Sequence, residues 1–151
     1  MSIYHLIDKS QIANIKEDQV ARVMVDMSCT LLHHGHIRII RQAAKLGEVI
    51  IALTTDEEIE AQKGYKPELP FEYRKEILLS IKYVSDVIAS KWLIDDQFLN
   101  DNNIDILVHG TDNSNQVKAS KLILLPRTNN ISSTIIRERS YKIHKAKLKQ
   151  A

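Results

Sequence analysis

The sequence predicts an α/β fold: a doubly wound, five-stranded parallel sheet with helices on both faces. Short apolar runs rich in β-branched residues alternate with segments of helical periodicity along the chain. The run from Val49 to Leu53 is apolar at every position, which is typical of a parallel strand covered on both faces. In such a sheet, ligands bind beyond the carboxyl ends of the strands, where the strand order reverses.

The apolar runs predict strands at residues 23–25, 49–53, 84–89, 104–110 and 122–125. Helical periodicity predicts helices at residues 37–46, directly after residue 54, and at 71–83, 95–102 and 131–149. We expect Gly47 to be the C-cap of the first helix, and Thr55 or Asp56 to be the N-cap of the second. Glycine and prolines make residues 64–70 a loop, and residues 113–120 hold a short helix or a loop.

The chain of 151 residues predicts one domain over residues 21–151, preceded by an N-terminal extension over residues 1–20. Within the extension, Ser10 is expected to cap a short helix over residues 10–16. We expect this extension to pack on the domain or to form an oligomer contact.

Charge and cysteine content exclude several classes of function. The 21 basic and 19 acidic residues nearly balance, and no basic run with interleaved aromatic residues appears, so no nucleic-acid partner is expected. No apolar run approaches the roughly 20 residues that cross a bilayer, so no membrane insertion is expected. The single cysteine, Cys29, and the lack of a secretory signal at the N-terminus point to the cytoplasm.

The junction between the first strand and the first helix carries His33, Gly35 and His36. The start of a helix attracts phosphate through its free backbone N–H groups and its positive dipole end. Two histidines three residues apart lie on one face, where both can donate to one phosphate, and Gly35 allows a nucleotide to approach. The alternatives are a surface histidine cluster or an adventitious metal site, but no cysteine or carboxylate stands at ligand spacing nearby, so we expect no metal site.

A second group of polar residues, Ser132, Ser133 and Thr134, marks the start of the last helix. These residues alone are explained most simply as a capping box. Arg127 and Arg137, which flank them, add charge and a bidentate geometry, so we expect an anion site here.

Three further polar positions have an ordinary structural explanation beside a functional one. Lys63 could hold a substrate phosphate or be a solvated loop residue. Arg74 could lie near the same site, or it could be a structural residue of the predicted helix, paired with Glu72 or Glu76. The segment 109–112 ends a predicted strand, where it is either a ligand-binding turn or simply a polar turn.

Two motifs, His33-x-Gly35-His36 and Arg127-Thr128-x-x-Ile131-Ser132-Ser133-Thr134, occur in this order after a strand and before the last helix. Together they resemble the cytidylyltransferase-like nucleotidyltransferases, and within them the glycerol-3-phosphate cytidylyltransferases. The resemblance runs from about Arg22 to Arg139 and includes the segments 43–48, 54–57, 71–75, 83–87 and 103–105.

The resemblance implies a Rossmann-like fold that joins a nucleoside triphosphate to a phosphate or phosphonate acceptor, for example in cell envelope biosynthesis. The acceptor attacks the α-phosphorus in line, and pyrophosphate leaves with Mg²⁺. His33, His36 and Arg127 are implied to be catalytic, and Lys63 to contact the acceptor or the triphosphate. The implied nucleotide-binding residues are Ser28, Cys29, His33, Gly35, His36, Arg127, Thr128, Ile131, Ser132, Ser133 and Thr134. Relatives are usually homodimers.

The chain departs from the family pattern in two segments near the expected acceptor. The family loop Gly-Thr-Phe-Asp is Met27-Ser28-Cys29-Thr30 here, and the family segment Gly-Asp-Asp-Trp is Gly110-Thr111-Asp112-Asn113. Thr30 and Thr111 therefore replace carboxylates on the acceptor side, so we assign them to substrate binding and expect a different acceptor or a weaker enzyme. An ATP-dependent adenylyltransferase and a nucleotide-binding module without turnover stay open beside a CTP-dependent enzyme.

Overall fold

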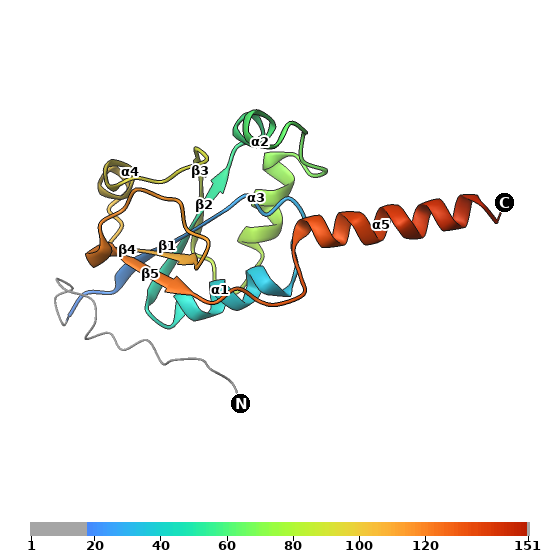
Figure 1. Ribbon diagram of the computed structural model, residues 1–151. Coiled ribbons are helices and arrows are strands. Elements are labelled where there is room, and N and C mark those ends of the chain that lie inside the picture. The colour runs from blue at the N-terminus through green and yellow to red at the C-terminus, as the bar shows by residue number, and fades with distance from the viewer. Residues whose placement is uncertain (1–17, 151) are drawn as a thin grey trace.

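A five-stranded parallel sheet in the order β3-β2-β1-β4-β5 forms the centre of the computed structural model, which describes residues 18–150 (Figure 1). Its strands are β1 (Ala21–Met27), β2 (Gly47–Thr54), β3 (Asp86–Ser90), β4 (Ile106–Gly110) and β5 (Leu122–Leu125). All four pairings between neighbouring strands are parallel. The order reverses between β1 and β4, so the carboxyl ends of these two strands flank the crevice in which a doubly wound sheet binds ligands.

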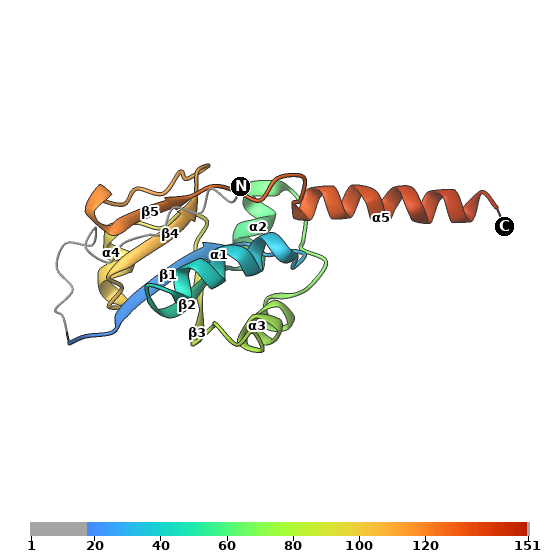
Figure 2. The ribbon, with the colours of Figure 1, turned by 90° about the horizontal axis from the view of Figure 1, so that it is seen from below.

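Helices cover both faces of this sheet, which confirms the predicted fold class. They are α1 (His34–Ala44), α2 (Asp56–Lys63), α3 (Phe71–Leu79), α4 (Asp96–Asp101), the 3₁₀ helix η2 (Ala119–Lys121) and α5 (Ser133–Leu148). Successive residues of β1 belong to different cores because side chains alternate along a strand. Val25 packs with Ile40 of α1 and Leu78 of α3, whereas Met24 packs with Leu99 of α4. Figure 2 shows α1 and α3 on the same side of the sheet.

The C-terminus of α1 differs from the prediction, because Lys45 is its C-cap and Gly47 is the first residue of β2. A Cβ atom at Gly47 would lie 2.1 Å from the carbonyl oxygen of Ala21, its partner in the β1–β2 register. Glycine is therefore required by the close approach of two strands, and the prediction that it caps the helix was wrong.

Helix α3 ends at Leu79 rather than at Tyr83, where the sequence placed its end. The Ser80 hydroxyl donates to the carbonyl of Glu76, and the chain then turns so that the amide of Ser85 donates to Val49 of β2. The helix has to stop early because the following residues must reach the edge of the sheet. Within residues 18–150, the other predicted strands and helices are present with ends shifted by a few residues, as is usual for sequence-based boundaries.

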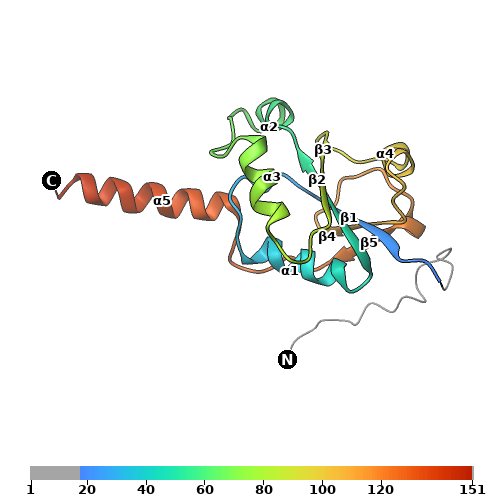
Figure 3. The same ribbon diagram turned by 180° about the vertical axis from the view of Figure 1, so that it is seen from behind.

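Helix α5 leaves the body of the domain and projects into solvent, as all three views show (Figure 3). None of its 16 residues is buried. Within residues 18–150, no helix has the length and apolar character needed to cross a membrane. The predicted helix over residues 10–16 lies outside the described residues, and the division into an extension and a domain stays a prediction.

Candidate active site

A cleft of about 1420 Å³ opens at the carboxyl ends of the strands. It is lined by the end of β1, the start of α1, the end of β4 and the segment that joins β5 to α5. All eleven residues assigned to nucleotide binding line this cleft, namely Ser28, Cys29, His33, Gly35, His36, Arg127, Thr128, Ile131, Ser132, Ser133 and Thr134. Lys63 lines it as well, so the structure brings the two sequence motifs and this lysine to one place.

The two histidines of the first motif are fixed by the backbone at the start of α1. His33 is the N-cap, and its Nδ1 accepts a hydrogen bond of 3.1 Å from the amide of Gly35. His36 accepts a bond of 3.2 Å at Nδ1 from the amide of His33, which completes a capping box. Since both Nδ1 atoms are acceptors, the proton of each neutral ring is on Nε2. The ring centroids are 3.9 Å apart, so the two Nε2–H donors belong to adjacent rings.

Both imidazoles are neutral near pH 7. Burial, followed by repulsion from His33 and Arg127, lowers the pKa of His36 to about 3. Burial, followed by repulsion from His34 and Arg127, lowers the pKa of His33. The pair is therefore suited to hydrogen bonding with developing negative charge on a phosphate, rather than to donating a proton.

The segment before α5 and the first residues of this helix combine capping with groups that line the cleft. The Ser132 hydroxyl caps the helix by accepting from the amide of Ile135 at 3.0 Å, so the simple capping explanation holds for this residue. Ser133 instead bonds to the backbone of Leu31, and Thr134 lines the cleft. Arg127 pairs with Asp112 at 2.9 Å.

Arg137 does not line the cleft and is not a free positive charge for an anion. Its guanidinium pairs with Glu68, lies over the ring of Tyr65, and donates to the Thr30 hydroxyl at 3.2 Å. Thr30 is buried, Thr111 is exposed, and neither lines the cleft. Their assignment to substrate binding stays a prediction, and the structure does not group them with the other site residues.

Arg74 is a structural residue, with a partner different from those expected. Its buried guanidinium pairs with Asp56 at 2.5 Å, not with Glu72 or Glu76. It also donates to the carbonyl of Ser28 at 2.6 Å, and so holds the loop that precedes the histidines. The next residue, Cys29, has a φ of 44°, which is unusual for a residue with a side chain. Burial raises the pKa of the Cys29 thiol to about 12, so it is uncharged.

A third polar group in the cleft was only partly anticipated from the sequence. The Nδ1 atom of His109 lies 2.5 Å from Oδ1 of Asp26, and the Asn115 amide donates to Oδ2 of Asp26 at 3.0 Å. Burial lowers the pKa of His109, but the hydrogen bond and the charge of Asp26, with the charge of Asp112, outweigh it and raise this pKa. The available signal was that Asp26 and His109 both stand where predicted strands end.

The described residues contain no group of three or more His, Cys, Asp or Glu side chains that could hold a metal ion. Of the carboxylates that line the cleft, Asp26 is bonded to His109 and Asn115, and Asp112 to Arg127. A metal ion in this cleft would therefore take its ligands mainly from a bound substrate.

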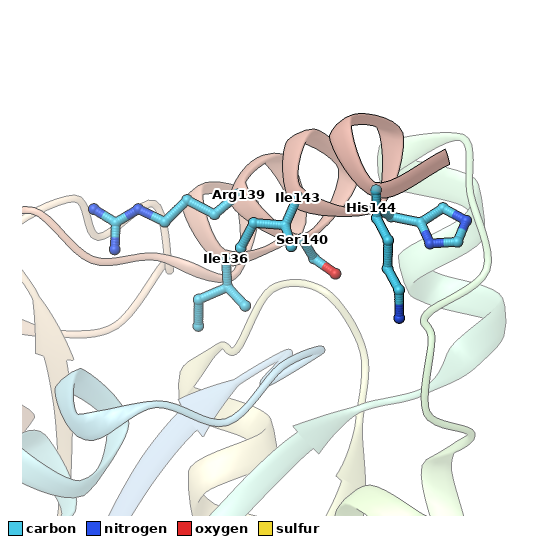
Figure 4. A pocket seen from close by; sticks show the side chains of 6 residues that line it. Ile136, Arg139, Ser140, Ile143 and His144 are labelled. Atoms are coloured by element: carbon cyan, nitrogen blue, oxygen red, sulfur yellow. The ribbon is translucent and has the colours of Figure 1, made fainter. Parts of the chain in front are cut away.

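A second, shallow hollow lies along α5, and none of the residues assigned to the site from the sequence lines it. Its lining comes from this one helix and comprises Ile136, Arg139, Ser140, Ile143, His144 and Lys147. In Figure 4, Ile136 and Ser140 point to the same side of the helix. Because one helix alone forms it, this hollow lacks the enclosure and converging polar groups of a small-molecule site.

Comparison with known proteins gives a family and a fold. The family model described as Cytidylyltransferase-like matches residues 30–139. The chain is 38% identical over 113 residues to glycerol-3-phosphate cytidylyltransferase of Bacillus subtilis (strain 168), covering 72% of this chain and 88% of that protein. It is 37% identical over 75 residues to FAD synthase of Pyrococcus horikoshii (strain ATCC 700860 / DSM 12428 / JCM 9974 / NBRC 100139 / OT-3), covering 49% of this chain and 51% of that protein.

Among solved structures, the lipopolysaccharide core biosynthesis protein from Thermoplasma volcanium GSS1 matches with a TM-score of 0.62. The match covers 74% of this chain and 100% of that chain, at 20% sequence identity. At this identity the likeness shows a common fold and nothing about substrates.

Proposed function

Because the chain belongs to the cytidylyltransferase-like family and is a nucleotidyltransferase, we propose that it transfers CMP from CTP to a small molecule that bears a phosphate or phosphonate, such as glycerol 3-phosphate. Pyrophosphate is the second product. The 38% identity to a glycerol-3-phosphate cytidylyltransferase supports CTP and an acceptor of this kind.

The observation that carries this proposal is the pair of neutral Nε2–H donors at the start of α1. Both histidines line the cleft that Arg127 and the start of α5 also line, and Nε2–H is the ring donor that the bonds at the helix start leave unused. An oxygen of the acceptor phosphate forms a bond to the α-phosphorus of CTP, and the bond from that phosphorus to the oxygen bridging to the β-phosphorus breaks. The electron pair leaves with pyrophosphate. The attacking oxygen is already anionic, so the step needs no general base.

The protein's contribution to this step is positioning and charge stabilisation. We assign to His33 and His36 hydrogen bonds that strengthen as charge builds on the α-phosphate oxygens. Arg127 would neutralise charge on the triphosphate, and the N-terminus of α5 adds free backbone N–H groups. Lys63, which also lines the cleft, would contact the acceptor or the triphosphate.

Mg²⁺ is proposed to enter with the triphosphate. It prefers phosphate oxygens and water as ligands and seldom needs a complete protein site. This fits a cleft whose carboxylates, Asp26 and Asp112, are occupied by His109, Asn115 and Arg127. When bound, the ion neutralises triphosphate charge and assists departure of pyrophosphate.

An ATP-dependent adenylyltransferase is a second candidate, and the similarity to an FAD synthase favours it. A nucleotide-binding module with weakened turnover is a third, because the family resemblance implies carboxylates at the positions of Thr30 and Thr111. Under the first proposal, the CDP-activated product would serve the synthesis of envelope or capsule material in the cytoplasm.

We also propose a homodimer. Helix α5 supports this proposal because it has no buried residue and leaves Tyr141, Ile143 and Leu148 more than 60% exposed. A second copy of the chain would cover these apolar side chains, and light scattering coupled to gel filtration measures the mass of the assembly.

Release of pyrophosphate tests the activity directly. The purified chain is incubated with Mg²⁺, either CTP or ATP, and a panel of acceptors including glycerol 3-phosphate, phosphoethanolamine and simple phosphonates. We expect release with CTP and a phosphate or phosphonate acceptor. Release with ATP alone would support the second candidate, and tight CTP binding without release would support the third.

A further inference from the structure

We propose that His109, held by Asp26, is a specificity-determining residue that binds the anionic phosphate or phosphonate group of the acceptor through Nε2–H. This inference rests on the proposed function, since it concerns the second substrate of that reaction. Neither residue belongs to the two sequence motifs.

The first argument is the position of the pair in the sheet. Asp26 and His109 lie near the carboxyl ends of β1 and β4, the neighbouring strands between which the strand order reverses. Two residues earlier in each strand, Met24 and Leu107 belong to the core on the α4 face. Side chains two apart share a face of a strand, so the pair lies on the α4 side of the sheet edge.

The histidines of the first motif lie on the opposite side, since α1 packs into the core formed by Val25 and Val108. A ligand at the sheet edge therefore has two polar walls. The α1 wall, with the start of α5, offers the donors assigned to the triphosphate. The α4 wall offers His109, and Lys63 and Trp92 line the same cleft.

The second argument is that the pair is rigidly prepared for a ligand. Both oxygens of Asp26 are engaged, one by His109 Nδ1 and the other by Asn115. Asn115 is itself buried and accepts from the amide of Ile94 at 2.7 Å. Asp26 therefore fixes the orientation of the ring and has no oxygen free for a ligand, as expected for a supporting residue.

His109 has one atom left for binding. Its side chain is 20% exposed and lines the cleft, and its Nε2 lies 3.8 Å from Oδ1 of Asp112, beyond hydrogen-bond distance. With Nδ1 committed to Asp26, the imidazolium form donates through Nε2–H, whereas the neutral form presents a lone pair there. Only the charged form can bind a phosphate oxygen.

Three charged groups face this ring: Asp26 from β1, Asp112 from the loop after β4, and Arg127 from the segment after β5. Asp112 is paired with Arg127, so its negative charge is largely balanced, as Asp26 is balanced by His109. Burial and Arg127 lower the pKa of His109, but the two carboxylates outweigh these effects. The net shift of the pKa is therefore upward, which favours the imidazolium form. A bound dianion would raise this pKa again.

Steady-state kinetics with CTP and glycerol 3-phosphate test the assignment. A hydrogen bond between charged groups is worth about one to two powers of ten in affinity, so we expect His109→Gln to raise the KM for glycerol 3-phosphate about 10- to 100-fold. The KM for CTP should change by less than about twofold. His144→Gln on the exposed part of α5 is the matched control, and it should change neither constant.

The pH dependence separates binding by His109 from a merely structural role. In the wild type, the KM for glycerol 3-phosphate should rise as pH increases through the pKa of His109, because the donor proton is lost. Asp26→Asn keeps the shape of the supporting residue but removes its charge, so the rise should move to lower pH. An effect of His109→Gln on the KM for CTP alone, or on neither KM, would overturn the proposal.

A second measurement does not depend on turnover. The ring of His109 is titrated by NMR in the presence of a non-hydrolysable CTP analogue, with and without saturating glycerol 3-phosphate or inorganic phosphate. We expect either anion to raise the pKa of this ring. If the wild type shows no turnover, the proposed function fails while this titration still decides the role of His109. An unchanged pKa with both anions would contradict that role.

Discussion

Ser133 and Leu31 exchange two hydrogen bonds: the Leu31 amide donates to the Ser133 hydroxyl at 3.2 Å, and that hydroxyl donates to the Leu31 carbonyl at 3.0 Å. The two residues are 102 positions apart in the chain. This exchange joins the loop before α1 to the start of α5, and so fixes the distance between the two motifs of the site.

Removing the hydroxyl with Ser133→Ala should therefore affect both stability and activity. The loss of two partly buried hydrogen bonds is expected to lower the free energy of unfolding by about 1–2 kcal/mol. The value of kcat/KM for CTP should fall as well, because the motifs lose their fixed spacing. Urea unfolding and pyrophosphate release measure the two effects, with Ser140→Ala, an exposed serine on the same helix, as the control. Equal stability of the two variants would show that the hydrogen bonds between Ser133 and Leu31 do not stabilise the fold.

His36→Ala should remove most of the rate while leaving the affinity for CTP within a few-fold. Its Nε2–H is assigned a hydrogen bond that strengthens in the transition state, and removing one such donor typically costs about 10²–10³ in kcat. Calorimetry with CTP measures affinity, and pyrophosphate release measures kcat. His34→Ala is the matched control because His34 is the exposed neighbour in the same turn. Normal turnover of His36→Ala would show that the assigned role is wrong.

Gly35→Ala tests how closely the first motif is packed. A Cβ atom there would lie 2.8 Å from Cε1 and 2.9 Å from Nδ1 of His33, so the ring must move away from its bond to the helix start. We expect a large loss of kcat with a folded protein by circular dichroism. Gly64→Ala is the contrasting variant: it meets no atom within 4 Å but sits at a φ of 76°, so it should cost about 1 kcal/mol of stability and leave kcat unchanged. Full activity of Gly35→Ala would contradict the packing argument.

Acid should destabilise the protein partly through His36. The pKa of this group is about 3 in the folded protein, against an ordinary value of 6.5, so the unfolded chain binds its proton first as pH falls. The stability that the neutral ring contributes is complete above about pH 6.5 and is lost progressively toward pH 3. Urea unfolding at pH 7 and pH 4.5 should therefore show a smaller loss for His36→Gln than for the wild type. His144→Gln should behave as the wild type, and the same loss in all three proteins would contradict the assignment.

Local features of the sequence sufficed to predict the elements and both motifs. The apolar run at Val49–Leu53 forms a buried interior strand, and the Ser132 hydroxyl caps a helix, because both patterns depend on a few consecutive residues. The predicted ends of helices and strands were wrong where contacts between residues distant in the sequence determine them. Gly47 was assigned to a helix end, whereas the backbone of Ala21 in another strand requires it.

The sequence by itself determined the parallel α/β fold and the histidine pair at the start of α1, since both depend on neighbouring residues. It also determined the family, since each of the two motifs that indicate it is a short run of residues. Only the tertiary structure decided which distant side chains meet. Asp26 and His109 are 83 positions apart and are adjacent because the order of strands places β1 beside β4. Arg74 pairs with Asp56, and Arg137 pairs with Glu68. Loops separate the residues of each pair, and sequence periodicity does not predict the course of these loops. Pairs of this kind depend on the order of the strands and the course of the loops. One of them, Asp26 with His109, forms the proposed binding site for the acceptor phosphate.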